Sequence, residues 1–225
     1  KWSADVQEGR PVYPKQRKRQ PRRLVAVGAR VYFTFGQDAP VSILDAATGK
    51  ILKVLEHTQH CGEIVHFRDR LFVSIRHTTE AESQNSIRSL DSSTGKLFWE
   101  SEKYTGHPGY HPEHDNLTMT MGNDRLFFLD ELRMVCLDLE TGQQLWESGF
   151  ANPNPNADTR TGSATNSIVR PRITKTSAPS SLIHHEGTVF LLNQFAKPCL
   201  SAVDSQTGKT LWQTHRRPVS CGTTT

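Results

Sequence analysis

One short pattern occurs four times in this chain, and it restricts the possible folds more than any other feature. The copies read LDAATGKIL, LDSSTGKLFW, LDLETGQQLW and VDSQTGKTLW. Each copy has threonine three residues and glycine four residues after its aspartate, and three copies have tryptophan eight residues after it. The residues are Asp45, Thr48 and Gly49; Asp91, Thr94, Gly95 and Trp99; Asp138, Thr141, Gly142 and Trp146; and Asp204, Thr207, Gly208 and Trp212. The aspartates lie 46, 47 and 66 residues apart, and a period of roughly 40–50 residues is typical of one four-stranded propeller blade.

The chemistry of the pattern predicts a tight turn between two strands. Aspartate can accept hydrogen bonds from backbone N–H groups that follow it, and glycine adopts positive φ without steric cost. A second signal, a turn followed by a run rich in strand-forming residues, precedes each copy and reads GARVYFTF, RDRLFVSI, NDRLFFLD and EGTVFLLN. We expect a further strand in the weaker segments, such as residues 62–67 and 116–121. Since no helical period is visible, we predict an all-β chain built from four-stranded antiparallel blades.

The four fixed positions resemble the pyrroloquinoline-quinone-type (PQQ-like) propeller repeat. That repeat occurs in quinoprotein alcohol dehydrogenases and in BamB-type assembly lipoproteins of the bacterial outer membrane. The resemblance covers about residues 22–212 and implies a bacterial protein of the periplasm or cell envelope. In the first copy Lys53 stands where the other copies have tryptophan. The first blade therefore either lacks the tryptophan contact between blades or docks against something different.

The resemblance also implies how the chain is organised. We expect residues 1–23 to be a basic connecting segment from a preceding blade and residues 24–225 to hold the repeats. The repeats are placed at about residues 24–56, 62–102, 116–150 and 180–215, with a long polar insertion at residues 151–180. Four to five blades are then present, and members of the resembling family form rings of seven or eight. We therefore expect an incomplete arc, completed by the remaining blades of a larger chain or by a second copy.

Three functions of different classes are compatible with this pattern. The first is a non-catalytic scaffold that binds protein partners through its face loops, since fold alone does not imply catalysis. The second is part of a PQQ-dependent quinoprotein oxidoreductase, with PQQ and calcium at the propeller axis. The family's pair of adjacent cysteines is absent, and the repeat aspartates are explained as turn formers, so we assign no catalytic or cofactor-binding residue. The third is a propeller that binds a polyanion or a small ligand.

The remaining candidate sites lie in segments between the blades. His107, His111, His114 and Asp115 have side chains that suit zinc or iron, but their spacing matches no metal site, so we favour an exposed polar loop over a metal site or substrate contact without metal. Six of the nine residues 15–23 are basic, which suits a polyanion or a solvated connection. No aromatic residue interrupts this basic run, which argues against nucleic acid. The insertion at residues 151–180 is read as a partner-binding loop or as a simple insertion. No apolar run is long enough to cross a membrane as a helix, and no signal peptide is visible.

Overall fold

All regular secondary structure that the structure describes is β-strand. The computed structural model describes residues 22–36, 38–78, 83–105, 117–130, 133–149, 181–193 and 199–215. These residues form sixteen strands in four separate four-stranded sheets. The predicted all-β fold class with four-stranded antiparallel blades is confirmed.

Each sheet is one blade, formed by four strands in sequence order. Blade 1 contains β1 (Leu24–Val27), β2 (Arg30–Thr34), β3 (Val41–Asp45) and β4 (Ile51–Leu55). Blade 2 contains β5 (Cys61–Phe67), β6 (Arg70–Thr78), β7 (Ser83–Asp91) and β8 (Leu97–Glu100). Blade 3 contains β9 (Met119–Gly122), β10 (Arg125–Asp130), β11 (Arg133–Asp138) and β12 (Gln144–Gly149). Blade 4 contains β13 (Ser181–His185), β14 (Thr188–Asn193), β15 (Cys199–Asp204) and β16 (Thr210–His215).

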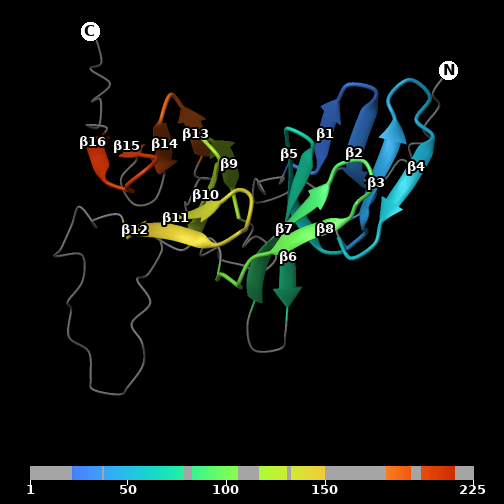
Figure 1. The fold of residues 1–225 in the computed structure, drawn as a ribbon, viewed down its shortest axis with the longest axis horizontal. Helices are drawn as coiled ribbons and strands as arrows, with labels where there is room; N and C mark the ends of the chain where they lie inside the picture. Colours follow the sequence, from blue (N-terminus) through green and yellow to red (C-terminus); the bar gives the residue numbers. More distant parts are fainter. Residues whose placement is uncertain are drawn as a thin grey trace, which may run out of the picture.

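The blades are arranged as an arc with their first strands on the inside. Strand β1 contacts β5, β5 contacts β9, and β9 contacts β13. Blade 1 (blue) and blade 4 (red) lie at opposite ends of the arc, with blades 2 and 3 between them (Figure 1). The fourth strand of each blade, which pairs with the third, is therefore the outer edge.

The hydrophobic core consists of layers between successive blades. On β10, Leu126 and Phe128 are buried in a cluster shared with blade 2, whereas Phe127 and Leu129 are buried in a cluster shared with blade 4. Successive side chains of a strand point to opposite faces of its sheet. A strand with neighbouring blades on both faces must therefore be apolar at consecutive positions, which explains the run Leu-Phe-Phe-Leu.

The four repeats form the same turn, here called the Asp-Thr-Gly turn (residues 45–49, 91–95, 138–142 and 204–208). In the third, Asp138 Oδ1 accepts hydrogen bonds from the N–H of Glu140 (3.1 Å) and from the N–H and hydroxyl of Thr141 (both 2.8 Å). The N–H of Gly142 donates to the carbonyl of Asp138 (2.9 Å). The same four bonds recur in the other three turns at 2.6–3.2 Å.

Each Asp-Thr-Gly turn also bonds to the hairpin between the first two strands of its own blade. The residue after the aspartate donates its N–H to a carbonyl of that hairpin, as in Leu139 to Asp124 (3.0 Å) and Ser205 to Gly187 (2.9 Å). The equivalent bonds in the first two blades join Ala46 to Ala29 and Ser92 to Asp69. The two sequence signals therefore meet at one end of every blade.

The turn glycines need both positive φ and a bare α-carbon. Gly142 has φ of 74°, and a Cβ built there would lie 2.5 Å from Cε3 of Trp99. Gly28 has φ of 56°, but a Cβ there would meet nothing within 4 Å. A substitution at Gly28 therefore tests backbone strain alone, whereas a substitution at Gly142 tests backbone strain together with a steric clash.

We predict that Gly142→Ala destabilises the protein more than Gly28→Ala does. Gly28→Ala should lower the free energy of unfolding by roughly 1–2 kcal/mol, the cost of a left-handed residue that carries a Cβ. Gly142→Ala should cost about 1–3 kcal/mol more, because the Trp99 ring must also move. Urea denaturation of both variants measures the difference, and equal losses would show that the tryptophan contact does not constrain the turn.

The turn aspartates also predict how stability depends on pH. Hydrogen bonds from the hydroxyl and N–H of the threonine three residues later lower the pKa of Asp45, Asp91, Asp138 and Asp204 below the ordinary 3.8. A carboxylate whose pKa is lower in the folded state stabilises the fold above the unfolded pKa, and this contribution is lost as pH falls through the folded pKa.

We therefore expect the stabilisation by these aspartates to be independent of pH near neutrality, and the melting temperature to fall as pH drops below about 4. Asp138→Asn should be less stable at neutral pH and should lose less stability on acidification, because the amide does not titrate. Thermal melts between neutral and acidic pH test this. An unchanged acid dependence in Asp138→Asn would contradict the assigned role of the carboxylate.

Candidate functional site

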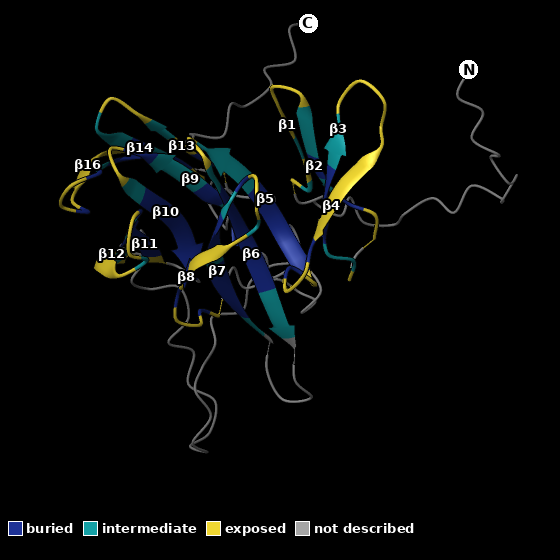
Figure 2. Cartoon of the chain, turned by 45° about the vertical axis from the view of Figure 1, so that its right-hand side comes forward, coloured by how far each residue is buried: buried dark blue, intermediate teal, exposed yellow. Residues whose placement is uncertain are grey.

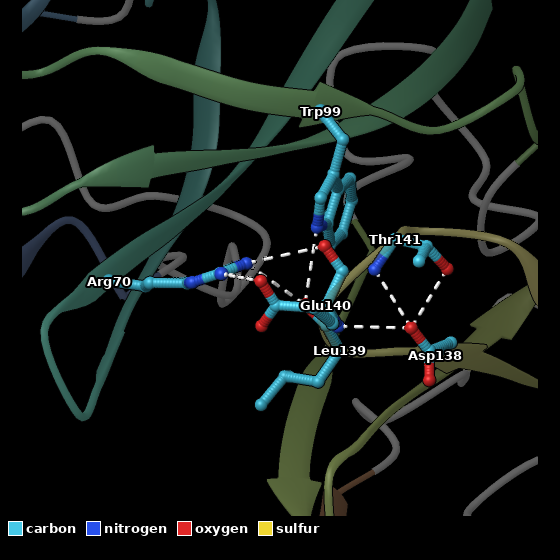
Figure 3. Close-up of polar contacts among 6 residues, drawn as sticks. All are labelled: Arg70, Trp99, Asp138, Leu139, Glu140 and Thr141. Carbon is cyan, nitrogen blue, oxygen red and sulfur yellow. Dashed lines mark hydrogen bonds and ion pairs between the residues drawn. The ribbon is translucent and has the colours of Figure 1, made fainter.

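At the boundary of blades 2 and 3, side chains of blade 2 hold the Asp-Thr-Gly turn of blade 3. The Trp99 ring covers Gly142, and its Nε1 donates to the carbonyl of Leu139 (3.1 Å). Arg70, at the start of β6, donates to the carbonyls of Leu139 and Glu140 (both 3.4 Å) and pairs with the Glu140 carboxylate (Figure 3). We call this arrangement the inter-blade clamp. It joins the apolar packing of a ring to hydrogen bonds that satisfy turn carbonyls.

The same clamp joins blades 3 and 4. The Trp146 ring lies 2.7 Å from the position that a Cβ of Gly208 would take. Arg125 donates to the carbonyls of Ser205 (3.2 Å) and Gln206 (3.0 Å). The carbonyl of Ser205 is equivalent to that of Leu139, to which both Trp99 and Arg70 donate at the preceding boundary. Nε1 of Trp146, unlike that of Trp99, is buried without a hydrogen-bond partner among the described residues.

The boundary of blades 1 and 2, where Lys53 replaces tryptophan, is closed by different residues. Leu55, two residues further along β4, packs against Gly95 in place of the indole ring. The hydroxyl of Tyr32 donates to the carbonyl of Ser92 (3.0 Å), which is equivalent to the carbonyl of Leu139 in blade 3. The packing and the hydrogen bond of one tryptophan are therefore divided between two side chains.

Two cations complete this first boundary. Lys53 Nζ donates to the carbonyl of Thr94, and Arg30 Nη1 donates to the hydroxyl of Ser93 (2.8 Å). Arg30 occupies the position of Arg70 in the next blade. Sequence reasoning missed the role of Tyr32, although the signal was present. Tyrosine replaces the phenylalanine of the other blades in the same repeat in which lysine replaces tryptophan.

In blade 4 the side chains of the clamp face no described turn. Trp212 is 44% exposed and lies with its ring centre 6.1 Å from that of Phe190. Thr188 stands where the other blades carry arginine. Trp99, by contrast, is 9% exposed. The tryptophan of the repeat is thus buried in blade 2, which a described blade follows, and exposed in blade 4.

The candidate metal ligands His107, His111, His114 and Asp115 lie outside the described residues. Within the described ranges, no group of three His, Cys, Asp or Glu side chains could hold a metal ion. The side chains of the adjacent residues His60 and Cys61 do not meet at a common site. His60 Nδ1 contacts Asp38 (2.8 Å) at the surface, whereas Cys61 is fully buried and burial raises the pKa of its thiol to about 12.

Of the basic segment, the structure describes Arg22 and Arg23, and Arg22 is part of the blade packing. Arg22 Nη2 lies 2.7 Å from the buried carboxylate of Glu63 on β5. The second oxygen of Glu63 accepts the N–H of Met119 on β9 (2.9 Å). One buried carboxylate therefore connects the entry to blade 1 with the inner strands of blades 2 and 3. The insertion at residues 151–180 lies outside the described residues.

Ser86, His77 and Glu100 have the residue types of a hydrolase triad but not its geometry. The hydroxyl of Ser86 donates to Glu100 (2.7 Å) and contacts His77 Nε2 (2.8 Å), so serine lies between the other two. In a triad the histidine stands between the serine and the acid. Ser86 is also fully buried, which denies a substrate access to the hydroxyl. The cluster is a structural network.

The outer strand β4 exposes an apolar surface. Ile51, Leu52 and Val54 are 48%, 53% and 43% exposed, and Figure 2 shows β4 in the colour of exposed residues. We call these three residues the β4 surface. At the position of Val54 the other outer strands carry polar residues: Glu100, Glu147 and Gln213. Exposed apolar residues in a row are typical of surfaces that bind other proteins.

Strand β4 also has a free backbone edge. In the described part of the chain it pairs with β3 alone. An edge strand presents unpaired N–H and C=O groups that can pair with a strand from another protein. The β4 surface therefore combines apolar side chains with main-chain hydrogen-bonding groups on one exposed strand.

Comparison with known proteins places this architecture in a family. A family model described as outer membrane protein assembly factor BamB matches the chain twice, over residues 1–174 and 83–224. The chain belongs to this family. A search of curated proteins finds no match. The PQQ-like repeat that the sequence pattern predicts is thereby confirmed.

Solved structures with a similar fold include one of BamB itself. The crystal structure of BamB from Moraxella catarrhalis has 14% sequence identity and a TM-score of 0.50, with 85% of this chain and 47% of that chain covered. The computationally designed Ika8 protein has 11% identity and a TM-score of 0.49, over 85% of this chain and 60% of that chain. A chain of a nidogen/laminin complex has 11% identity and a TM-score of 0.48, over 84% of this chain and 60% of that chain.

The chain spans about half the length of the matched BamB chain. The likeness therefore supports the fold and not the activity of a whole protein. Among the described residues there is no helix of the length and apolar character needed to cross a membrane.

We predict that Tyr32→Phe destabilises the protein by roughly 1–2 kcal/mol, because the buried carbonyl of Ser92 loses its donor. Tyr104→Phe is the matched control, since within the described ranges the Tyr104 hydroxyl makes long contacts, to Glu102 and Gln144 (both 3.4 Å). The control should cost less than about 0.5 kcal/mol. If chemical denaturation shows the same loss of stability in both variants, the Tyr32 hydroxyl does not take the place of the indole N–H that the first blade lacks.

Proposed function

We propose that this chain is a non-catalytic propeller scaffold that binds a protein partner in the cell envelope, in the assembly of outer-membrane proteins. Membership of the BamB-like family supports outer-membrane protein assembly as the process in which the chain takes part. The observation that supports binding by this chain is the β4 surface, where three exposed aliphatic side chains lie on an outer strand that pairs on one side only among the described residues. Periplasmic location is part of the same proposal.

The geometry of β4 favours a partner segment in extended conformation. Such a segment can add to an edge strand, with main-chain hydrogen bonds providing affinity and alternate side chains providing selectivity. Ile51 and Val54 pair with Leu44 and Ser42 across the β-bulge of β4 and therefore lie on the same face of the strand. A partner with apolar residues at every second position would cover them. Strands of outer-membrane barrels have this alternation.

The alternative of a PQQ-dependent oxidoreductase makes a different demand on the same chain. It requires PQQ and calcium to bind at the propeller axis. Calorimetric titration of the folded protein with PQQ in the presence of calcium distinguishes the two. Tight binding that depends on calcium would overturn the non-catalytic proposal and lead to assays with alcohols and sugars.

The test of the scaffold places a photoreactive phenylalanine analogue at position 52 or, as a matched control, at position 145. Leu145 is also exposed (46%) and has the same repeat position, but Glu147 stands where blade 1 has Val54. Irradiation with a solubilised outer-membrane fraction, followed by mass spectrometry, should identify assembly proteins at position 52 and few at position 145.

Val54→Glu should reduce that crosslinking about tenfold, which corresponds to the loss of about 1.4 kcal/mol of apolar contact. Equal yields from positions 52 and 145, or no adduct with an assembly protein at position 52, would contradict the proposal.

A further inference from the structure

The inner strands of blades 2, 3 and 4 differ at one position in whether the side chain can take up a proton. The position is the last but one of each strand, and its cross-strand partner belongs to the core layer shared with the preceding blade. Directly opposite residues of paired strands lie on the same face of a sheet, so this side chain faces the preceding blade. The residues are His66 on β5, Met121 on β9 and His184 on β13.

At the boundary of blades 3 and 4, the ring of His184 packs against blade 3 as an apolar group would. It is stacked on Phe127 of β10, with ring centres 5.7 Å apart and an angle of 4° between the planes. A Cβ on Gly122 would lie 2.0 Å from Nδ1 of His184, so the glycine leaves the space that the ring fills. Nε2 of His184 is buried and has no hydrogen-bond partner among the described residues.

The charged groups of blade 4 do not stabilise a proton on His184. His185, the next residue, is a second histidine, and its charge when protonated opposes a charge on His184. Glu186 lies 3.7 Å from His185 and is exposed, so solvent and salt screen its carboxylate. Strand β14 contains no ionisable side chain.

The charged groups of blade 3 do not stabilise that proton either. Strand β9 contains no ionisable side chain. On β10, Arg125 lies two residues before Phe127 and therefore on the face that meets blade 4, where its guanidinium opposes a second cation. Asp130, at the far end of β10, lies on the opposite face. Asp124, in the hairpin between β9 and β10, pairs with Arg68 of blade 2 (2.7 Å).

We propose that His184 is a pH-sensitive contact between blades 3 and 4, and that this boundary loosens when the ring takes up a second proton. The protonated ring carries an N–H on both nitrogens, and the N–H at Nε2 has no acceptor among the described residues. Protonation also places a charge between two packed sheets. The face of Phe127 attracts a cation, which offsets part of this cost.

The direction of the pKa shift gives the pH range of this response. Burial, and to a smaller extent His185, lower the pKa of His184 below the ordinary 6.5. A histidine whose pKa is lower in the folded state stabilises the fold above the unfolded pKa, and this contribution is lost as pH falls through the folded pKa. The response therefore begins near pH 6.5, above the range in which the turn aspartates with their ordinary pKa of 3.8 act.

The other two boundaries provide internal comparisons. Met121 has no titratable group, so the boundary of blades 2 and 3 has no such contact at this position. At the boundary of blades 1 and 2, the ring of His66 lies 5.7 Å from that of Tyr32 and is tilted by 34°. Burial lowers the pKa of His66, and the carboxylate of Asp69 opposes this shift. Arg30, on the same face of β2 as Tyr32, is a cation. We expect a smaller response there, because a carboxylate supports the protonated ring.

Hydrogen exchange of the complete chain tests the proposal. Wild type, His184→Met and the control His185→Ala are compared near neutral pH and at about pH 5.5, between the ordinary pKa values of histidine and aspartate. Methionine is the residue that blade 3 has at this position. Rates are corrected for the intrinsic exchange rate at each pH. Peptides covering residues 181–193 report on blade 4, and peptides covering residues 134–138 of blade 3 show that each variant is folded.

Acidification should lower the protection of residues 181–193 about tenfold in wild type, the effect of losing about 1.4 kcal/mol. His185→Ala should lose protection in the same way, because His184 is still present. His184→Met should keep its protection at both pH values, because the methionine does not titrate. Residues 134–138 should be equally protected in all three proteins.

Two outcomes would overturn the proposal. If residues 181–193 of wild type are equally protected at both pH values, the boundary tolerates the protonated ring. If His184→Met loses as much protection as wild type on acidification, another group causes the response. Loss of protection in His185→Ala at neutral pH does not enter this comparison, because each protein is compared with itself at the two pH values.

Discussion

The contact of one blade with the Asp-Thr-Gly turn of the next is the interaction on which the rest of this structure depends. A blade is a flat sheet with two apolar faces, and burial of both faces requires a neighbour on each side. The clamp fixes where that neighbour lies. Because the turn glycine lacks a Cβ, the ring of Trp99 or Trp146 approaches the backbone directly. The aspartate and threonine meanwhile hold the turn in the one conformation that presents its carbonyls to the incoming donors.

The first boundary shows that geometry is retained when its residues change. Leu55 provides the apolar contact, and Tyr32 provides the donor, where Trp99 alone does both in blade 2. Neither side chain occupies the position that it replaces. The boundary therefore requires a side chain that fills the space above the turn glycine and a donor that bonds the turn carbonyl. Several combinations of side chains meet both requirements. This also explains why the tryptophan is absent from one repeat without a gap in the core.

The turns could be predicted from the sequence because their bonds join residues at most four positions apart. The clamp could be predicted only in part. Arg70 and Glu140 are 70 residues apart, and Arg22 and Glu63 are 41 apart. A contact at such separation has no local pattern, and each arginine looks like an ordinary surface residue. Comparison of aligned repeats would have shown the paired change of tryptophan to lysine and phenylalanine to tyrosine. The exposure of β4 depends on the arrangement of blades and could not be predicted from its apolar residues alone.

The structural roles of the repeat residues also indicate which positions are available for function. Asp, Thr and Gly of the repeat, with Trp99 and Trp146, are engaged in intramolecular bonds and packing, which leaves them poorly suited to bind a partner. A function must use positions at which one blade differs from the others. Val54, where the equivalent outer-strand residues are polar, is such a position. At the equivalent positions Glu100 and Glu147 form ion pairs with Arg88 and Arg133 of their own blades. The exposure of Val54 is best explained by a partner that covers it, since an uncovered apolar edge strand favours aggregation.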